Sequence, residues 1–234
     1  MVGKTLSLCI TTYNRTSMLQ ECFQQVLDDD RVSEIIVADD GSPDNILRRV
    51  ERICAHPKVK LFKNQKNLGC YRNKQYVVSL ASNDYVIIFD SDNIMTKNYI
   101  DKIYEQEWNS DTILAPDFVH SFDYRHLSGV IIDRGNVRKY VDQPRFDCLI
   151  NTMNYFVNRD NYLKVWDGRI EPWTADTIFQ NRNWLVSGFK IHVLKGLEYN
   201  HRINHGNIEE KSHYLTHVRK TGNMFDKLMN ELRR

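Results

Sequence analysis

The chain has 234 residues, a length that suits one enzyme-sized domain. Its 32 Lys and Arg residues nearly balance its 30 Asp and Glu residues, which gives a formal net charge of +2 without long blocks of like charge. This balance argues against a nucleic-acid-binding protein, so no nucleic-acid partner is expected.

The five cysteines form no C-x-x-C pair and no zinc-ligand spacing with histidine, so we expect reduced thiols that are mostly buried. No apolar stretch approaches the roughly 20 residues that a membrane-spanning helix needs. We therefore expect a soluble cytoplasmic protein without a transmembrane segment, with peripheral membrane contact left open.

The first 115 residues alternate strand and helix patterns. Strands are predicted at residues 5–11, 33–38, 59–63 and 84–89, and helices at residues 17–27, 43–54, 71–81 and from 97 onward. Ser42 is the expected N-cap of the second helix, with Pro43 at its first helical position, and Thr96 is the expected cap of the fourth. This alternation predicts an α/β fold with a Rossmann-like, mostly parallel central sheet flanked by helices.

The second half of the chain is less regular. Short strands are predicted at residues 112–115, 129–132, 155–158, 190–194 and 197–201, and helices at residues 159–165, 176–186 and 212–232. No internal repeat or Pro/Gly-rich linker interrupts the sequence, so residues 1–234 are expected to form a single domain.

Polar residues follow each of the first four predicted strands. The four loops are Thr11-Thr12-Tyr13-Asn14-Arg15, Asp39-Asp40-Gly41-Ser42, Asn67-Leu68-Gly69-Cys70-Tyr71-Arg72-Asn73 and Asp90-Ser91-Asp92-Asn93. Because the carboxyl ends of parallel strands meet at one edge, where α/β proteins bind ligands, we expect these loops to face one cleft. Each loop alone could be a turn or a helix cap, but together they favour a shared site.

The residue types in these loops suit a metal-bound nucleotide diphosphate. Asp90 and Asp92 are two carboxylates one residue apart at the end of a buried strand, which suits a hard divalent cation that also holds phosphate oxygens. Asp39 can accept hydrogen bonds from a base imide or a ribose hydroxyl, and Tyr13 can pack on a base. Arg72 supplies a fork for phosphate or a sugar hydroxyl.

Two common nucleotide-binding motifs are absent from the sequence. The first strand leads to no G-x-G-x-x-G, and the chain contains no G-x-x-x-x-G-K-[ST]. These absences argue against a dinucleotide-dependent oxidoreductase and a P-loop NTPase.

The four stretches together resemble the family 2 glycosyltransferases of the GT-A fold. The matching segments are residues 6–15, 35–42, 67–69 and 89–93, in this order. The resemblance implies transfer of a sugar from a nucleotide sugar to a hydroxyl of a glycan or glycoconjugate, usually with inversion and with Mn²⁺ or Mg²⁺. Residues 1–115 would then bind the nucleotide, with UDP as the best guess, and residues 116–234 would form a smaller mixed region for acceptor binding and catalysis.

The resemblance also implies roles for individual residues. The donor would be bound by Thr11, Thr12, Tyr13, Arg15, Asp39, Asp40, Arg72, Asp90 and Ser91. Asp90 would reach the ribose or a metal-bound water, and Asp92 would bind the metal directly. His201 is the positional match for a further metal ligand, with His205 as the alternative, and a packing histidine is the simpler interpretation.

Asp176 occupies the position of the family's catalytic base, at the start of a helix about a dozen residues before Gly188. The usual Glu-Asp pair is here Ala175-Asp176, so a single carboxylate remains as the candidate. The alternative is an acidic residue that only stabilises the helix N-terminus. Trp173 and Trp184 could stack on a sugar ring or simply pack in the core.

Two other functions were weighed. A sugar nucleotidyltransferase would need a Gly-rich, Lys/Arg-bearing triphosphate loop after the first strand, which the sequence does not show. A non-catalytic carbohydrate-binding module of the same fold is disfavoured by the joint presence of Asp92, Asp176 and His201. The segment 118–145, where an acceptor pocket is expected, matches no pattern that we can interpret.

Overall fold

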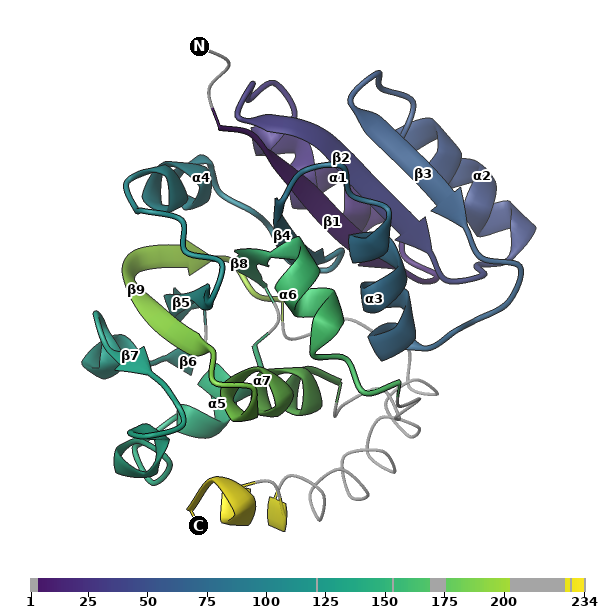
Figure 1. The fold of residues 1–234 in the computed structure, drawn as a ribbon. Helices are drawn as coiled ribbons and strands as arrows, with labels where there is room; N and C mark the ends of the chain where they lie inside the picture. Colours follow the sequence, from purple (N-terminus) through teal and green to yellow (C-terminus); the bar gives the residue numbers. More distant parts are fainter. Residues whose placement is uncertain are drawn as a thin grey trace.

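A computed structural model of the chain describes residues 4–120, 122–152, 154–168, 176–202, 226–227 and 229–233. Its centre is one sheet with the strand order β3-β2-β1-β4-β8-β5-β9-β7, and β6 pairs with β5 (Figure 1). The strands are β1 Leu6–Thr12, β2 Val32–Asp39, β3 Val59–Lys63, β4 Tyr85–Asp90, β5 Thr112–Val119, β6 Phe122–Asp123, β7 Ile131–Ile132, β8 Tyr155–Asn158 and β9 Lys190–Tyr199. The helices are α1 Ser17–Phe23, α2 Asp44–Ile53, α3 Cys70–Ser79, α4 Lys97–Tyr104, α5 Phe146–Ile150, α6 Arg159–Lys164 and α7 Asp176–Val186, with short 3-10 helices at Gln24–Val26, Arg125–Leu127 and Val137–Lys139.

The strands β1 to β4 run parallel to one another, so the predicted α/β alternation is confirmed for the first half. Beyond β4 the sheet is mixed rather than mostly parallel. β8 is antiparallel to both β4 and β5, whereas β5 and β9 are parallel. A hydrophobic pattern identifies a strand without naming its neighbours, so the insertion of β8 between β4 and β5 could not be predicted.

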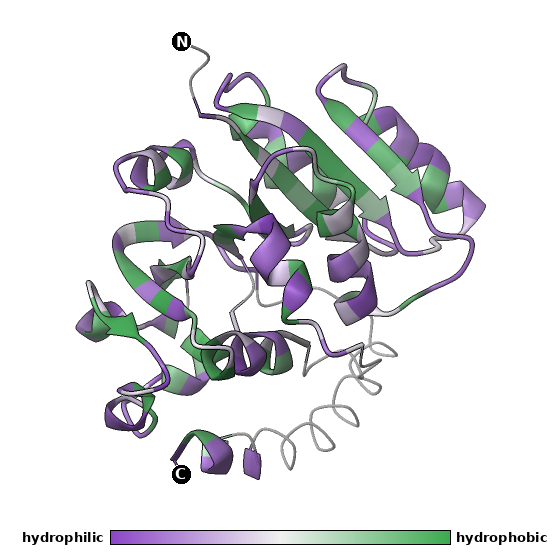
Figure 2. Cartoon of the chain, in the orientation of Figure 1, coloured by the Kyte–Doolittle hydropathy of each residue, from purple (hydrophilic) through white to green (hydrophobic). Residues whose placement is uncertain are grey.

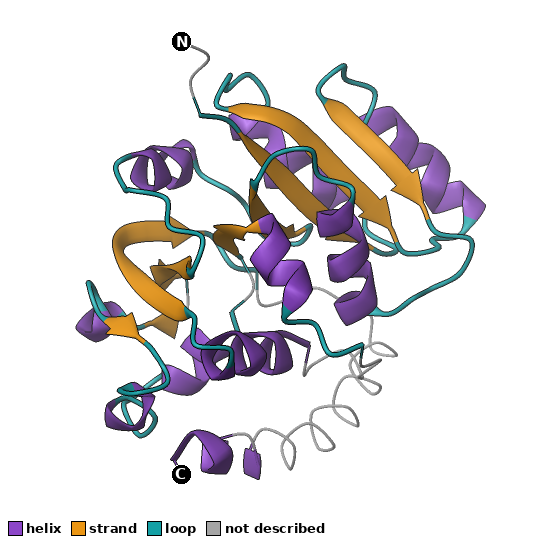
Figure 3. Cartoon of the chain, viewed as in Figure 1, coloured by secondary structure: helices purple, strands orange, loops and turns teal. Residues whose placement is uncertain are grey.

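The core of the parallel half lies on both faces of its sheet. Leu8 and Ile87 are register partners that share one face of the sheet, Cys9 and Ile88 are the next pair on the opposite face, and all four side chains are fully buried. Helices α3 and α6 lie on the near face in Figure 1 and α1 and α2 behind it, an arrangement that Figure 3 shows by element type. Figure 2 shows the same division by hydropathy, with apolar strands inside and polar residues on the helices. Such two-sided burial is typical of continuous apolar strands.

The start of α2 corrects one prediction. The helix begins at Asp44 with Pro43 in the cap position, so Ser42 is not the N-cap. The Ser42 hydroxyl instead donates a hydrogen bond to Asp39 Oδ2 at 2.6 Å. The Ser42 hydroxyl is therefore bound to the Asp39 carboxylate at the end of β2 and does not cap the first amides of α2.

The strand β9 corrects a second prediction. It is continuous, whereas the sequence predicts two strands separated at Lys195-Gly196. Gly196 has a φ of +76°, and the pairing of β5 with β9 shifts register between Pro116 and Phe118. The glycine therefore forms a bulge within one strand rather than a turn between two.

Two further elements follow the prediction in part. Thr96 does occupy the cap position of α4, but its hydroxyl contacts the Glu198 carbonyl at 3.5 Å and not the helix amides. The predicted helix at 212–232 lies mostly outside the described residues, of which 226–227 and 229–233 are helical. Among the described residues, no helix is both long and apolar enough to cross a membrane.

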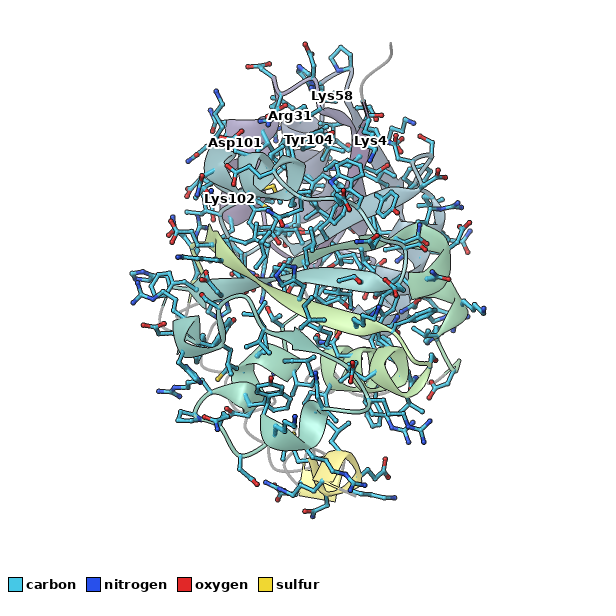
Figure 4. All side chains as sticks on the ribbon, turned by 60° about the vertical axis from the view of Figure 1, so that its left-hand side comes forward. Lys4, Arg31, Lys58, Asp101, Lys102 and Tyr104 are labelled. Carbon is cyan, nitrogen blue, oxygen red and sulfur yellow. The ribbon has the colours of Figure 1, made fainter. Side chains whose placement is uncertain are left out.

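A network of charged residues lies at the amino-terminal edge of the sheet. The Arg31 guanidinium contacts Asp29 and Asp101, each at 2.6 Å, and lies 5.1 Å from the centre of the Tyr104 ring. Lys58 Nζ donates to the Asp29 carbonyl at 2.9 Å. Figure 4 shows Arg31, Lys58, Asp101 and Tyr104 gathered at this end of the molecule. The Asp29–Arg31 pair is thus a structural pair far along the strands from their carboxyl ends.

Glu34 gives the parallel half a pH-dependent stability. Its carboxylate is 3% exposed and accepts hydrogen bonds from Lys60 Nζ and Ser7 Oγ, both at 2.6 Å, and from Ser82 N and Oγ, both at 2.7 Å. Burial by itself raises the pKa of Glu34, but these hydrogen bonds outweigh it and lower the pKa from 4.5 to about 2. The stabilisation is therefore present above about pH 4.5 and is lost as the pH falls toward 2.

We expect Glu34→Gln to lower the free energy of unfolding by about 3 kcal/mol at pH 7, a difference that shrinks steadily below pH 4.5. Urea unfolding of the wild type and Glu34→Gln at pH 7, 4 and 3 measures this difference in the free energy of unfolding. Glu51→Gln is the control, because it breaks an exposed pair with Lys63 and should cost little at any pH. An equal Glu34 effect at pH 7 and pH 3 would contradict the assignment.

Candidate active site

The carboxyl ends of β1, β2 and β4 meet at one edge because these strands are parallel and in register. Thr12 is the register partner of Asp39, and Thr11 is the partner of Asp90. The Asp40 amide donates to the Thr12 carbonyl at 2.9 Å, which joins two of the loops directly. The sheet therefore brings the predicted polar loops together, as the sequence indicated.

Asp39 lies at the centre of a small buried network. It is 1% exposed, and its Oδ1 accepts a hydrogen bond from the Ser42 amide at 2.8 Å. The Ser42 hydroxyl accepts from the amide of Asn14, which has a φ of +53° that asparagine tolerates. The adjacent Tyr13 is 41% exposed. The buried carboxylate and the exposed ring belong to neighbouring loops, and a nucleobase needs both a hydrogen-bond acceptor and a flat apolar face.

Asp40 organises the loop that leads into α3. Its Oδ1 accepts from the Leu68 amide at 2.8 Å and its Oδ2 from the Gly69 amide at 3.0 Å. Gly41 beside it has a φ of +80°, and a Cβ there would lie 2.8 Å from the Lys66 carbonyl carbon, so glycine is required. The Asp40 carboxylate thus holds the backbone that leads into α3, and its contact with the donor stays a prediction.

Asp90 is held from two sides by buried groups. Its Oδ1 lies 3.2 Å from Nζ of Lys74, whose side chain is 6% exposed on α3. The Asp90 amide donates to Asn154 Oδ1 at 2.7 Å, and Asn154 Nδ2 donates to the Tyr199 hydroxyl at 2.9 Å. A buried lysine therefore compensates the first carboxylate of the Asp-X-Asp element.

Asp92 is compensated differently. Its Oδ2 lies 2.5 Å from Nη1 of Arg15, and the side chains of Asp92 and Arg15 are 10% and 37% exposed. The Thr12 hydroxyl donates to the Arg15 carbonyl at 3.3 Å. The carboxylate is buried, but the guanidinium that neutralises it is at the surface.

His201 lies beside the same element. Its Nδ1 is 2.9 Å from Asn93 Oδ1, and the bridge between Ile94 and Asn200 brings the end of β9 to this loop. Within the described part of the chain, no three His, Cys, Asp or Glu residues come together as a metal-binding group. The oxygens of Asp92 and Asn93 nevertheless suit Mn²⁺ or Mg²⁺, with the remaining positions left for phosphate and water.

Ser91 and Arg72 occupy different environments from each other. The Ser91 hydroxyl is buried and has no hydrogen-bond partner among the described residues, so it is not presented to a ligand in this conformation. Arg72 is exposed on the first turn of α3. Of these two residues, only Arg72 is exposed to solvent.

Cys22 lies behind the carboxylates. Its Sγ is 3.7 Å from the Asp90 carbonyl oxygen. Burial, reinforced by the charges of Asp92 and Asp90, raises the pKa of the Cys22 thiol well above its usual value. Cys22 therefore stays protonated, and it is neither a nucleophile nor a thiolate ligand.

Helix α7 begins at Asp176, the predicted catalytic base. One turn later, the fully buried Gln180 accepts hydrogen bonds from the Tyr71 hydroxyl at 2.9 Å and Gln75 Nε2 at 3.2 Å, and it donates to the Tyr162 carbonyl at 2.8 Å. Tyr71 is on the first turn of α3, which follows one of the four loops. The network thus fixes the first turns of α7 beside the start of α3.

The remaining candidates divide into packing residues and residues that are not described. Trp184 is fully buried and its Nε1 donates to the Lys190 carbonyl at 2.8 Å, so the packing interpretation is confirmed. Trp173, His205 and the side chain of Asp176 lie outside the described part of the chain.

Lys74 and Asn154 are not among the residues predicted for the site, and Asn93 is placed in the fourth loop without a role of its own. Lys74 lies three residues after Tyr71 and four before Val78 on the buried face of α3, and a lysine at such a position signals a buried partner. Asn154 carries no comparable signal, because its contacts with Asp90 and Tyr199 join residues distant in sequence.

The parallel half-sheet and the mixed second half define an α/β protein with a polar site at the carboxyl edge of its sheet. The chain matches the model of glycosyl transferase family 2 over residues 7–165, and it belongs to this family.

Relatives of known name agree with this assignment. The chain is 27% identical over 124 residues to glycosyltransferase GlyG of Streptococcus pneumoniae, a match that covers 52% of the chain and 41% of GlyG. In structure it is similar to a mannosyltransferase of Pyrobaculum calidifontis solved with GDP-Man and Mn²⁺, with a TM-score of 0.67, 14% identity and coverage of 95% and 65%. It is also similar to S. aureus TarS solved with UDP-GlcNAc, with a TM-score of 0.64, 17% identity and coverage of 87% and 60%. The fold is therefore of the GT-A type, and the chain spans less than half the length of GlyG.

Proposed function

We propose that the chain is a metal-dependent, inverting glycosyltransferase that transfers a sugar from a nucleotide-diphosphate sugar to a hydroxyl of a glycan or glycoconjugate. The observation that carries this proposal is the meeting of Asp39, Asp90 and Asp92 at one sheet edge in a chain of glycosyl transferase family 2. Residues 1–115 form the donor half and residues 116–234 the acceptor half of one domain.

The donor half binds the nucleotide through its loops. Thr11, Thr12 and Tyr13 border the nucleoside, and the Asp39 carboxylate accepts from an N–H of the base. Uracil presents one imide N–H to such an acceptor, and UDP is therefore our preferred nucleotide. Guanine also presents donors to a carboxylate, so GDP is the alternative.

The catalytic groups act on the two sides of the transferred sugar. A divalent cation held by Asp92, with His201 or Asn93, would supply charge neutralisation to the departing diphosphate. Arg72 contacts the phosphates or a sugar hydroxyl. Asp176 takes the proton from the acceptor hydroxyl as it attacks the opposite face of the sugar, which inverts the anomeric centre.

Calorimetric titration of the chain with UDP, GDP and dTDP, each with and without Mn²⁺, tests the donor site. We expect UDP to bind most tightly and only in the presence of Mn²⁺. If GDP bound most tightly, the preferred base would be guanine and not uracil. If the diphosphate bound equally tightly without Mn²⁺, nucleotide binding would not depend on the metal. No binding of any diphosphate under either condition would overturn the proposal in favour of a non-catalytic module of the same fold.

A further inference from the structure

The two carboxylates of the Asp-X-Asp element each face a cation of the chain itself, but the two cations differ. Lys74 is 6% exposed and lies 3.2 Å from Asp90. Arg15 is 37% exposed and lies 2.5 Å from Asp92. In the first pair the lysine is buried and the Asp90 side chain is 31% exposed, whereas in the second the Asp92 side chain is only 10% exposed and its cation is the exposed partner.

This difference determines which carboxylate is open to exchange. The Lys74 ammonium has no direct route to solvent, because its side chain is buried on the face of α3 that packs on the sheet. The Arg15 guanidinium needs only a side-chain rotation toward solvent. Asp92 is itself 10% exposed, so it is costly to leave without a positive partner.

We propose that Arg15 is an exchangeable counter-ion of the metal site. In the unliganded chain its guanidinium neutralises Asp92, and it yields this carboxylate to a divalent cation when the donor binds. The released guanidinium then has a new acceptor in the donor diphosphate, to which its fork can make two hydrogen bonds. This inference rests on the proposed function. It adds that the divalent cation competes with Arg15 for the Asp92 carboxylate.

The competition has a thermodynamic consequence. A divalent cation that approaches Asp92 while Arg15 is in place meets a like charge and a carboxylate that is already engaged. Affinity for the metal alone is therefore weakened by Arg15, whereas a bound diphosphate draws Arg15 away and removes the penalty. Because coupling is reciprocal, the metal raises nucleotide affinity through Arg15 by the same factor.

Binding of Mn²⁺ alone to the wild type, Arg15→Gln and Arg15→Lys tests the proposal. The loss of the free Mn²⁺ signal in electron paramagnetic resonance reports binding without any turnover. We expect Arg15→Gln to bind Mn²⁺ about tenfold more tightly than the wild type, and UDP to raise its Mn²⁺ affinity by a factor about tenfold smaller than in the wild type. Arg15→Lys keeps a positive charge beside Asp92 but without the guanidinium fork, so its Mn²⁺ affinity should lie between those of the wild type and Arg15→Gln.

Arg49→Gln is the matched control, because it removes one guanidinium from an exposed position on α2. It should leave Mn²⁺ affinity unchanged, which excludes a general effect of net charge. Equal or weaker Mn²⁺ binding by Arg15→Gln, with UDP-dependent Mn²⁺ binding intact in the wild type, would overturn the exchange while leaving the proposed function standing. If no protein binds Mn²⁺ with or without any nucleoside diphosphate, the metal-dependent function fails and the exchange fails with it.

Discussion

Replacing Asp176 with Asn is expected to lower kcat by about 10³-fold, within the range that a general base typically contributes. An amide cannot accept the proton of the acceptor hydroxyl, but it has almost the same shape as the carboxylate. Affinity for the nucleotide should therefore stay within about twofold of the wild type, because ground-state binding of the donor does not use the base. Steady-state transfer assays and calorimetry with the donor nucleotide measure the two quantities.

The control must separate catalysis from stabilisation of a helix N-terminus, since Asp176 is the first residue of α7. Asp160 provides this comparison, because it is an exposed acid in the first turn of α6 and pairs with Arg159. Asp160→Asn should lose a few tenths of a kcal/mol of stability and no activity. Turnover of Asp176→Asn near the wild-type level would show that Asp176 also serves only its helix.

The parallel half of the fold could be predicted because its information is local. β3 matches its predicted range, and β1, β2 and β4 differ from theirs by a single residue at either end. In these segments continuous apolar residues identify each strand, and the polar residues after it identify its carboxyl end. Parallel alternation then places Asp39, Asp90 and Asp92 at one edge without knowledge of any contact.

The second half could not be predicted as well, because its structure depends on distant pairing. The helix α5 has only five residues, too short for a helical period to be evident. The bulge at Gly196 has the local sequence of a turn, and only the pairing of β9 with β5 keeps it in one strand. The pairs Arg15–Asp92 and Lys74–Asp90 likewise join residues that are far apart in sequence. The sequence therefore identified the chemical groups of the site but not their partners.

Replacing Asp92 with Asn is expected to abolish the effect of Mn²⁺ on nucleotide binding. With Mn²⁺ present, affinity for the preferred diphosphate should fall by about 100-fold, whereas without Mn²⁺ it should be no weaker than in the wild type, because Arg15 no longer pairs with a carboxylate at this position. The reason is that a neutral amide is a weaker ligand for a hard divalent cation than a carboxylate, and the structure supplies few other protein oxygens at this position. Calorimetric titration at matched Mn²⁺ concentrations measures both affinities.

Asp29→Asn is the matched control for this experiment. Asp29 is 10% exposed and pairs with an Arg31 that is 31% exposed, which closely repeats the burial of the Asp92–Arg15 pair at the opposite edge of the sheet. Its loss should destabilise the fold through Arg31 but leave the Mn²⁺-dependent affinity for the diphosphate unchanged. If Asp92→Asn retained wild-type affinity in Mn²⁺, Asp92 would be a purely structural partner of Arg15 like Asp29. The carboxylate that positions the cation would then have to be Asp90, which could bind it only after giving up its buried contact with Lys74.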